Sequence, residues 1–502
     1  MTDEEQEKTK VDHEPPAGST TKAKWNDVEY TATAKWMVLR KKDKPSAEVF
    51  SISYVSDGAS VERPVTFVFN GGPGAASVYL HMGAVGPRRI EFPEDGSMPP
   101  VPAKIVDNDA CWLDFTDIVL IDPVGTGFSR IIEPEEPKDG EKKKDPKGEE
   151  FNPNAYFSVR RDLESMCEVM ARWLSENGRW GSPVFIAGES YGGYRTGRLV
   201  RMAQEEAGIG LNGAIVISPA LDPTHLGIVL GGWGDYEVEP WIDVFPTMAA
   251  AAAYHGRSRV FEKGTPVEEV VREAELFATG DYASFLTRGA AMPVEERDRI
   301  LNRFADLAGL DPEYVKRSEG RIRIFQFQRE VLRGTGKVVG RYDATVTAVD
   351  PYPDRDTFAG SDPTLTGFNP AFATAVNRRL RQELGVETDR EYKILNWDVI
   401  MNWKNDEQQS YFQGTQGAVD DFRYGLAMNP HMKAFITHGW YDLMTPYYKS
   451  DRFRNLMRLD PSVADRVTVQ HFDGGHMFYS WTASRKAFHS AIKNFVAEAI
   501  DG

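Results

Sequence analysis

Short runs of apolar residues recur along most of the chain, and several are separated by segments with helical spacing. The runs are Val65 to Phe69, Ile118 to Ile121, Val184 to Ala187, Ala214 to Ile217, Ala434 to Thr437 and Val467 to Val469. Between the second and third runs, apolar residues from Leu163 to Leu174 repeat at the period of a helix. Strands that are apolar on both faces and alternate with helices form a mostly parallel sheet covered on both sides. The pattern therefore predicts an α/β fold.

The two ends of this pattern differ from its middle. Tyr30 to Leu39 and Val49 to Tyr54 are rich in β-forming residues and flank a polar turn, which predicts antiparallel strands at one edge of the sheet. At the other end, apolar residues from Phe488 to Ala499 recur at helical spacing. We expect antiparallel strands to open the core and a helix to close it.

Three segments interrupt the pattern. Residues 1–24 are polar and charged, so they cannot bury enough apolar surface to fold, and we expect a disordered tail. Residues 132–153 are a dense mixture of charged residues, Pro and Gly, which indicates a solvated loop. Residues 224–412 are mainly helical in pattern and stand between two predicted strands, which favours an inserted cap domain. The α/β core is then formed by residues 25–223 and 413–502.

Charge and composition narrow the class of partner. The 502 residues include Lys+Arg 59 and Asp+Glu 75, a net charge of −16, which argues against binding nucleic acid or an anionic membrane through bulk charge. The charged N-terminus lacks the apolar core of a signal peptide, so we expect a cytoplasmic protein, with export by another route left open. The oligomeric state is not determined by these features.

The chain contains two cysteines, Cys111 and Cys167. Two cysteines provide neither a disulfide framework nor a cysteine-rich metal site. We expect buried free thiols, with a single bridge between them as the alternative. Since no cluster of His, Cys and Asp has metal-ligand spacing either, no metal or other cofactor is expected.

The strongest chemical signal is Gly188-Glu189-Ser190-Tyr191-Gly192, directly after an apolar run and before a predicted helix. A strand, a tight turn and a helix with serine at the apex expose the hydroxyl at the end of a buried strand, and small flanking residues allow the sharp bend. Ser190 is therefore the candidate nucleophile. The alternative is a serine with a purely structural role in the turn.

An acid and a base follow later in the chain, in the order that such a hydrolase topology requires. Asp442 follows the predicted strand Ala434 to Thr437, and His476 follows Val467 to Val469 in a glycine-flanked loop. The expected roles are attack by Ser190, proton transfer by His476, and orientation of its imidazole by Asp442.

Other residues compete for these roles. His471 and His489 are the alternatives to His476, and Asp473 is the alternative to Asp442. His438 is expected to be a buried hydrogen-bonding residue. We favour structural or surface roles for His471, at a strand end, and for His489, off the apolar stripe of the last helix. Asp473 could hold the turn before His476.

A second glycine-rich segment, Asn70-Gly71-Gly72-Pro73-Gly74, follows the strand that ends at Phe69. Such a turn can direct backbone N–H groups at one oxygen. The N–H groups of Gly72 and Tyr191 are the natural pair for an oxyanion hole.

Five blocks in order together resemble the serine carboxypeptidase family: NGGPG at 70–74, DPVGTGFS at 122–129, GESYGG at 188–193, Asp442, and Gly475-His476-Met477. The resemblance covers residues 48–223 and 430–500. It implies an α/β-hydrolase fold with a helical cap, and removal of C-terminal residues from peptides. It also implies that Asn70, the Gly71 amide and Glu189 bind the substrate's terminal carboxylate.

This chain departs from the family pattern in three respects. Ala84 stands where the family usually has a second glutamate that bonds to the first, so Glu189 lacks that partner and we expect activity to extend nearer to neutral pH. Ala75 replaces the cysteine that normally follows NGGPG, in keeping with a reducing compartment. The cap sequence matches no pattern that would indicate substrate preference.

These features favour a serine-type carboxypeptidase that forms an acyl-enzyme on Ser190 and acts on peptides or peptide-like amides. An esterase or acyltransferase with the same triad is the alternative, because fold and triad do not fix the acyl acceptor. A catalytically silent protein that binds ligands in the capped cleft is an alternative of another class.

Overall fold

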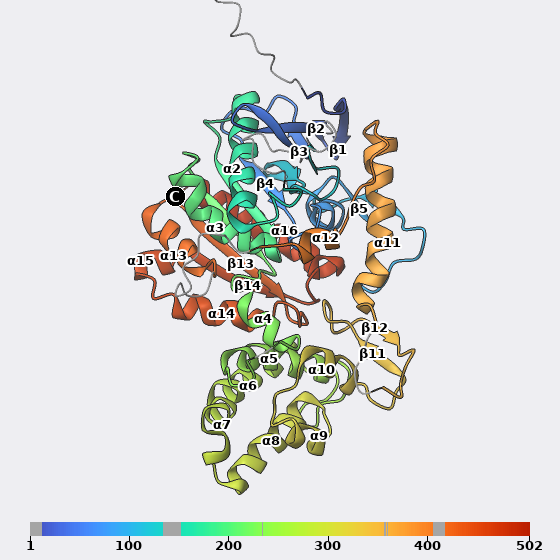
Figure 1. Cartoon of the computed structure of the whole chain (residues 1–502), viewed down its shortest axis with the longest axis vertical. Coiled ribbons are helices and arrows are strands. Elements are labelled where there is room, and N and C mark those ends of the chain that lie inside the picture. Colours follow the sequence, from blue (N-terminus) through green and yellow to red (C-terminus); the bar gives the residue numbers. More distant parts are fainter. Residues whose placement is uncertain are drawn as a thin grey trace, which may run out of the picture.

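A central sheet organises the chain. The computed structural model describes residues 13–133, 152–232, 234–355, 358, 360–404 and 417–501. Within this part, ten strands form one sheet in the order β1-β2-β3-β7-β4-β9-β10-β13-β14, with β8 beside β3 (Figure 1). The strands are β1 Ser19–Trp25, β2 Val28–Lys41, β3 Lys44–Ser56, β4 Val65–Phe69, β7 Asp117–Ile121, β8 Arg130–Ile131, β9 Val184–Glu189, β10 Gly213–Ile217, β13 Lys433–Gly439 and β14 Val467–Phe472.

Strand direction divides this sheet into two parts. β1, β2 and β3 are antiparallel, and β3 is also antiparallel to β7. From β7 through β4, β9, β10 and β13 to β14 the strands are parallel. All six apolar runs are strands of this parallel part, so the predicted mostly parallel sheet with an antiparallel edge is confirmed.

Helices cover both faces of the sheet because its strands are apolar on both sides. In β9, Val184 and Ile186 pack on the face covered by α2, α3 and α13, while Phe185 and Ala187 pack on the face covered by α16. The helices and short turns of the core are α1 Val78–Leu80, η2 His81–Val85, η3 Trp112–Asp114, α2 Val159–Glu176, α3 Tyr191–Glu205, α13 Val419–Met428, α14 Tyr447–Leu456, α15 Pro461–Ala464, η7 Phe478–Ser480 and α16 Thr482–Asp501. A two-stranded sheet, β5 Arg88–Ile90 with β6 Ile105–Asp107, lies beside them.

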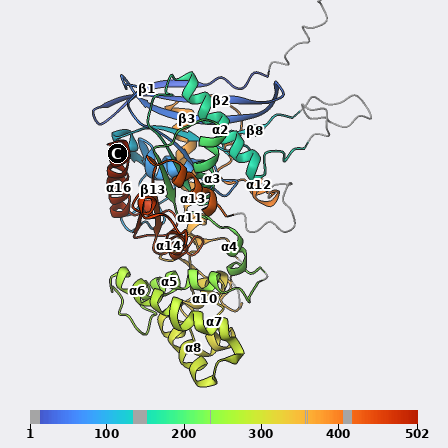
Figure 2. The same cartoon turned by 90° about the vertical axis from the view of Figure 1, so that its left-hand side faces the viewer.

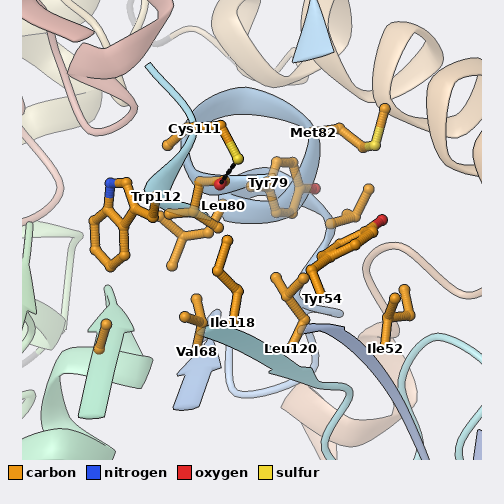
Figure 3. Packing of buried hydrophobic residues seen from close by; sticks show 14 of the residues in the cluster. Ile52, Tyr54, Val68, Tyr79, Leu80, Met82, Cys111, Trp112, Ile118 and Leu120 are labelled. Carbon is orange, nitrogen blue, oxygen red and sulfur yellow. Dashed lines mark hydrogen bonds between the residues drawn. The ribbon is translucent and has the colours of Figure 1, made fainter. Parts of the chain in front are cut away.

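Both cysteines are free and buried, as predicted. Cys111 lies among aromatic and aliphatic side chains and donates through Sγ to Val85 O at 3.3 Å (Figure 3). Burial raises the pKa of the Cys111 thiol and raises that of Cys167 to about 12. Neither thiol is therefore activated as a nucleophile at neutral pH.

The prediction of a disordered tail over residues 1–24 is wrong for its last part, and residues 1–12 lie outside the described residues. Residues 19–24 belong to β1, which pairs antiparallel with β2 along its whole length. Trp25 is buried at the end of β1, and its indole donates to Asn108 O at 2.7 Å. Pairing to a long neighbouring strand stabilises a segment whose own side chains are mostly polar.

The first part of the insertion after β10 forms a helical lobe with its own apolar core. The lobe extends away from the sheet, at the bottom of Figure 1 and again in Figure 2. Tyr441, Leu443 and Tyr447 of the sheet domain join this core and so connect the two bodies. The lobe contains α4 Thr224–Val229, α5 Glu239–Tyr254, α6 Val267–Phe277, η4 Ala278–Tyr282, α7 Ala283–Arg288, η5 Gly289–Ala291, α8 Val294–Ala308, α9 Pro312–Arg317 and α10 Ile324–Glu330.

The second part of the insertion returns to the core. A hairpin of β11 Lys337–Val339 and β12 Thr347–Val349 leads into α11 Pro363–Asn377, η6 Arg378–Glu383 and α12 Trp397–Met401. Phe368 and Phe372 of α11 pack in the same apolar cluster as the sheet, and α11 runs along the side of the core in Figure 1. One helical cap over 224–412 is therefore too simple a description, because α11 buries its apolar face on the core and not on the lobe.

Most of the loop predicted over residues 132–153 lies outside the described residues, which resume at 152. None of the helices in the described ranges combines the length and the hydropathy that crossing a bilayer requires.

Candidate active site

The predicted nucleophile lies on a sharp turn between β9 and α3. Ser190 has φ 63° and ψ −123°, and a non-glycine residue held in a disfavoured region of this kind is strained by about 1–3 kcal/mol. Its N–H donates to Ile217 O at 3.0 Å, and its carbonyl accepts from Ala220 N at 3.0 Å. The strand, turn and helix expected from the sequence are present, at the carboxyl end of the parallel strands.

Glycines allow the surrounding backbone to pack closely against this turn. A Cβ at Gly188 would lie 2.0 Å from Gly192 O, a separation that no side chain tolerates. A Cβ at Gly71 would lie 2.4 Å from Tyr191 N. The loop after β4 therefore lies directly against the first turn of α3.

The predicted acid and base meet at the ends of β13 and β14. His476 Nδ1 lies 2.6 Å from Asp442 Oδ2, and both side chains are buried. A carboxylate only accepts hydrogen bonds, so Nδ1 carries the proton and Nε2 is left as the basic nitrogen. Met444 N and Thr445 N donate to Asp442 Oδ1 at 2.9 and 3.0 Å and fix the carboxylate in place.

A threonine hydroxyl completes the surroundings of this pair. Thr445 Oγ1 lies 2.6 Å from Asp442 Oδ2, 2.9 Å from Ser218 O and 3.0 Å from His476 Nδ1. His438 bonds through Nδ1 to Thr445 O at 2.9 Å and is a buried structural residue, as expected. The acid loop is thus anchored to the segment that follows β10.

Opposing effects act on the pKa of His476. Burial lowers it, while the Asp442 carboxylate, its hydrogen bond and the charge of Glu189 raise it, and the net shift is upward from the usual value. A base whose pKa is raised above 6.5 is partly protonated near neutral pH, and it accepts a proton from a serine more readily.

The two predicted oxyanion donors lie on the two loops that Gly71 brings together. Tyr191 is the first residue of α3, so its N–H has no acceptor within the helix. Among the described residues, neither Tyr191 N nor Gly72 N has a recorded acceptor. Both N–H groups remain available for an oxygen bound next to Ser190.

Glu189 is buried beside the nucleophile and is hydrogen-bonded at both oxygens. Asn70 Nδ2 donates to Oε1 at 2.9 Å, and Tyr479 Oη donates to Oε2 at 2.6 Å. The orientation of the Asn70 amide follows from Leu80 N, which donates to Asn70 Oδ1 at 3.0 Å. Burial raises the pKa of Glu189 to about 7, and the Asp442 carboxylate adds to the rise.

Tyr479 is the second hydrogen-bond partner of Glu189, in a chain that has Ala84 at the position of the family's second glutamate. Ala84 is buried in η2, and its methyl group has no polar function to offer Glu189. The Tyr479 hydroxyl donates to the second oxygen of Glu189 instead, so both oxygens are hydrogen-bonded without a second glutamate.

One pocket is lined by six of the eight predicted site residues, all except Asp442 and Tyr191. Its space is about 400 Å³, including the open mouth. Asn70, Gly71, Gly72, Glu189, Ser190 and His476 supply the polar part of its lining, and the apolar part comes from Ala75, Tyr79, Tyr342, Leu365, Leu395 and Met477. Three of the apolar residues, Tyr342, Leu365 and Leu395, belong to the insertion.

The competing residues lie outside this arrangement. His471 Nε2 lies 2.9 Å from Asp451 Oδ1, and His489 lies 3.6 Å from the carboxylate of Asp114. Asp473 is exposed, and His476, three residues later in the same loop, bonds to Asp442 instead.

Three contributors were not predicted from the sequence. Tyr479 is 290 residues from Glu189, and Tyr342 lies within the insertion, where its ring stands edge-on to His476 at 5.2 Å between centroids. Thr445 lies three residues after Asp442. A polar residue at that spacing from a candidate acid is the one local hint that could have been followed.

The fold is that of an α/β-hydrolase: a mostly parallel sheet covered on both faces by helices, with the serine turn after β9 and the acid and histidine in loops after β13 and β14. The comparisons agree. The family model described as serine carboxypeptidase matches residues 33–227. This match confirms the predicted resemblance to the serine carboxypeptidases over that part of the chain.

Two curated relatives match about a third of the chain each. The pheromone-processing carboxypeptidase kex1 of Aspergillus fumigatus is 25% identical over 185 residues, which is 35% of this chain and 23% of the relative. Serine carboxypeptidase-like 36 of Arabidopsis thaliana is 26% identical over 164 residues, which is 32% of this chain and 29% of the relative. The chain covers about a quarter of the length of these relatives.

A solved structure extends the likeness to the whole fold. Kex1(Δ)p, a prohormone-processing carboxypeptidase from Saccharomyces cerevisiae, superposes with a TM-score of 0.53, covering 93% of this chain and 92% of that one. The sequence identity is 15%, so this likeness concerns the fold alone.

Proposed function

We propose that this protein is a serine-type carboxypeptidase that hydrolyses the C-terminal peptide bond of its substrates. The observation that carries the proposal is the position of Glu189 and Asn70 in the same pocket as Ser190 and His476. A group that recognises a carboxylate, held one residue from the nucleophile, favours cleavage next to a chain end.

The steps follow from the positions of these groups. Ser190 Oγ attacks the carbonyl carbon, and His476 Nε2 takes the hydroxyl proton and then delivers it to the leaving amine. Asp442 keeps the imidazole oriented and stabilises its charged form. Water, activated by His476, then hydrolyses the acyl-enzyme. The Gly72 and Tyr191 N–H groups stabilise the oxyanion, each by about 3 kcal/mol.

Recognition of the substrate carboxylate depends on the protonation state of Glu189. With a pKa of about 7, Glu189 is largely neutral in mild acid and can donate its proton to a carboxylate. Above that pH it is ionised and repels the same group. This supports carboxypeptidase activity that reaches towards neutral pH.

A pair of blocked dipeptides tests the proposal, one with a free C-terminal carboxylate and one amidated. At pH 6 we expect kcat/KM to be much larger for the free acid. Equal turnover of the two would contradict carboxylate recognition and favour an esterase or acyltransferase.

A fluorophosphonate probe tests the chemistry separately from the specificity. Wild-type protein should be labelled on Ser190, and the Ser190→Ala variant should not. Absence of labelling in the wild type would favour the silent ligand-binding alternative.

A further inference from the structure

The loop between β11 and β12 crosses from the insertion to the two loops that hold the acid and the histidine. This loop, residues 340–346, is closed by hydrogen bonds from Gly340 N to Val346 O at 2.8 Å and from Val346 N to Asp343 O at 3.1 Å. We call residues 340–346 the bridging loop. Its tip lies between segments that are separated by more than thirty residues in the core.

The bridging loop contacts the acid loop on both sides of Asp442. Ala344 N donates to Tyr441 O at 3.0 Å, and Leu443 N donates to Arg341 O at 3.0 Å. The residues before and after the acid are therefore paired with the same short segment of the insertion.

The bridging loop also contacts the histidine loop at two successive residues. His476 N donates to Tyr342 O at 2.5 Å, and Gly475 N donates to Asp343 Oδ2 at 3.0 Å. A Cβ at Gly475 would lie 2.2 Å from Tyr342 O and 2.4 Å from Asp343 Cα. The approach is so close that only glycine fits there.

Asp343 connects the shape of the bridging loop to the histidine loop. Asp343 is 3% exposed, and its carboxyl group accepts from Thr345 N at 2.9 Å and Thr345 Oγ1 at 2.6 Å, in addition to Gly475 N. Three donors converge on two oxygens, an arrangement that suits a carboxylate and not an amide. Removing the side chain leaves buried N–H groups without an acceptor.

The bridging loop is itself anchored to the insertion. Arg341 N donates to Asp362 Oδ2 at 2.6 Å, at the start of α11, and His255 Nε2 lies 2.7 Å from Ala344 O, at the end of α5. The helical lobe and α11 thus both hold the segment that touches the acid and histidine loops.

We propose that Asp343 is a positioning residue for the reaction, and that the bridging loop sets His476 against Asp442. The proposal rests on the proposed roles of the triad but not on the carboxylate specificity. The expected consequence is that losing the Asp343 carboxylate lowers turnover and leaves substrate binding nearly unchanged.

The test uses an activated ester of a blocked amino acid, which a serine hydrolase turns over without recognising a terminal carboxylate. Complete labelling with a fluorophosphonate counts the active sites, so kcat is expressed per labelled site. For Asp343→Ala we expect kcat per site to fall about 10–100-fold, the range that misplacement of a catalytic group produces, with KM within about threefold. Asp343→Asn keeps the side-chain volume and one acceptor oxygen, so its kcat per site should lie between those of wild type and Asp343→Ala.

Asp117→Ala is the matched control. Asp117 is equally buried and accepts from Arg63 Nε at 2.8 Å and Arg179 Nη1 at 2.6 Å, at the opposite end of the parallel strands. This variant should lower the melting temperature and the number of labelled sites, with kcat per site unchanged.

A merely structural role for Asp343 would give the same result as the control, and that result overturns the proposal. If Asp343→Ala does not fold, Asp343→Asn is measured instead. Unchanged kcat per site in Asp343→Asn would likewise overturn the proposal. Failure of the proposed function appears differently, as absence of labelling or of ester turnover in the wild type.

Discussion

The two halves of the candidate active site are held in place in different ways. The nucleophile half, formed by the loops after β4 and β9, is braced from within: Arg195 of α3 donates to Asn70 O at 2.6 Å and to Pro73 O at 3.0 Å, and pairs with Asp162 of α2 at 2.6 Å. The histidine half, formed by the loops after β13 and β14, is braced by the bridging loop of the insertion.

The two halves of the candidate site are supported by different parts of the chain. The nucleophile half lies within residues 33–227, the range that the serine carboxypeptidase family model matches. The histidine half rests on a segment that is part of the insertion, so changes in the insertion reach the base directly. Residues of the insertion therefore both line the pocket and contact the histidine loop.

The largest effects should come from removing one reacting group from either half. We expect Ser190→Ala and His476→Ala each to lower kcat about ten-thousand- to million-fold, because the triad acts as a unit. Ester turnover and fluorophosphonate labelling measure this. His489→Ala is the control and should stay within about threefold of wild type; a comparable loss in that variant would reassign the base.

A glycine-to-alanine change in each half tests how that half is held in place. At Gly188 a Cβ meets Gly192 O at 2.0 Å, and at Gly475 it meets Tyr342 O at 2.2 Å. We expect kcat to fall more than about 100-fold for Gly188→Ala and about 10–100-fold for Gly475→Ala. The first change displaces the serine turn, and the second displaces the bridging loop from the histidine loop.

Gly181→Ala is the control for both, since no atom lies within 4 Å of a Cβ built there. Limited proteolysis adds a second readout. Cleavage within the insertion should become faster in Gly475→Ala and stay unchanged in Gly188→Ala. The opposite pattern would show that the insertion supports the nucleophile half instead.

Glu189 gives the pH dependence of carboxylate recognition its direction. Its pKa is raised to about 7, so the neutral form that binds a carboxylate predominates below pH 7 and is lost above it. We expect kcat/KM for the free-acid dipeptide, relative to the amide, to fall about tenfold per pH unit above pH 7. In Glu189→Gln, which stays neutral, this fall should disappear; identical profiles in the two proteins would refute the role of Glu189.

Tyr479→Phe should give the smallest effect. The Tyr479 hydroxyl donates to Glu189 Oε2 and lowers the pKa of that carboxyl, so its loss should raise the pKa. The alkaline fall in kcat/KM for the free acid then moves to higher pH, with a rate change of about threefold at pH 7. Tyr282→Phe, deep in the helical lobe, is the control; a shift to lower pH in Tyr479→Phe contradicts the assignment.

The sequence predicted those parts of the molecule that local pattern determines. Each apolar run forms a strand. In a run such as Val184 to Ala187, alternate residues are buried on the two faces of the sheet, and this pattern is visible in the sequence. The serine turn could be predicted from its own sequence, since glycines flank the serine and Gly188 packs against Gly192 O, four residues later. Asp442 and His476 could be read from their order after two strands.

The remaining features depend on contacts between distant segments. Tyr479 reaches Glu189, and Tyr342 reaches His476, only after the sheet has formed and the insertion has folded onto it. The path of the insertion is another example, because the apolar face of α11 fits the core and the lobe equally well as a pattern. β1 forms because β2 offers it a complete edge, which its own polar residues do not reveal.

In the proposed function, Ser190 attacks the last peptide bond of the substrate while Glu189 recognises its free carboxylate. The most direct test is to incubate an unmodified peptide and its C-terminally amidated twin with the enzyme at pH 6 and to follow both by mass spectrometry. We expect stepwise loss of single C-terminal residues from the free peptide, while the amidated one stays intact. Cleavage within the chain, or equal loss from both peptides, would contradict it.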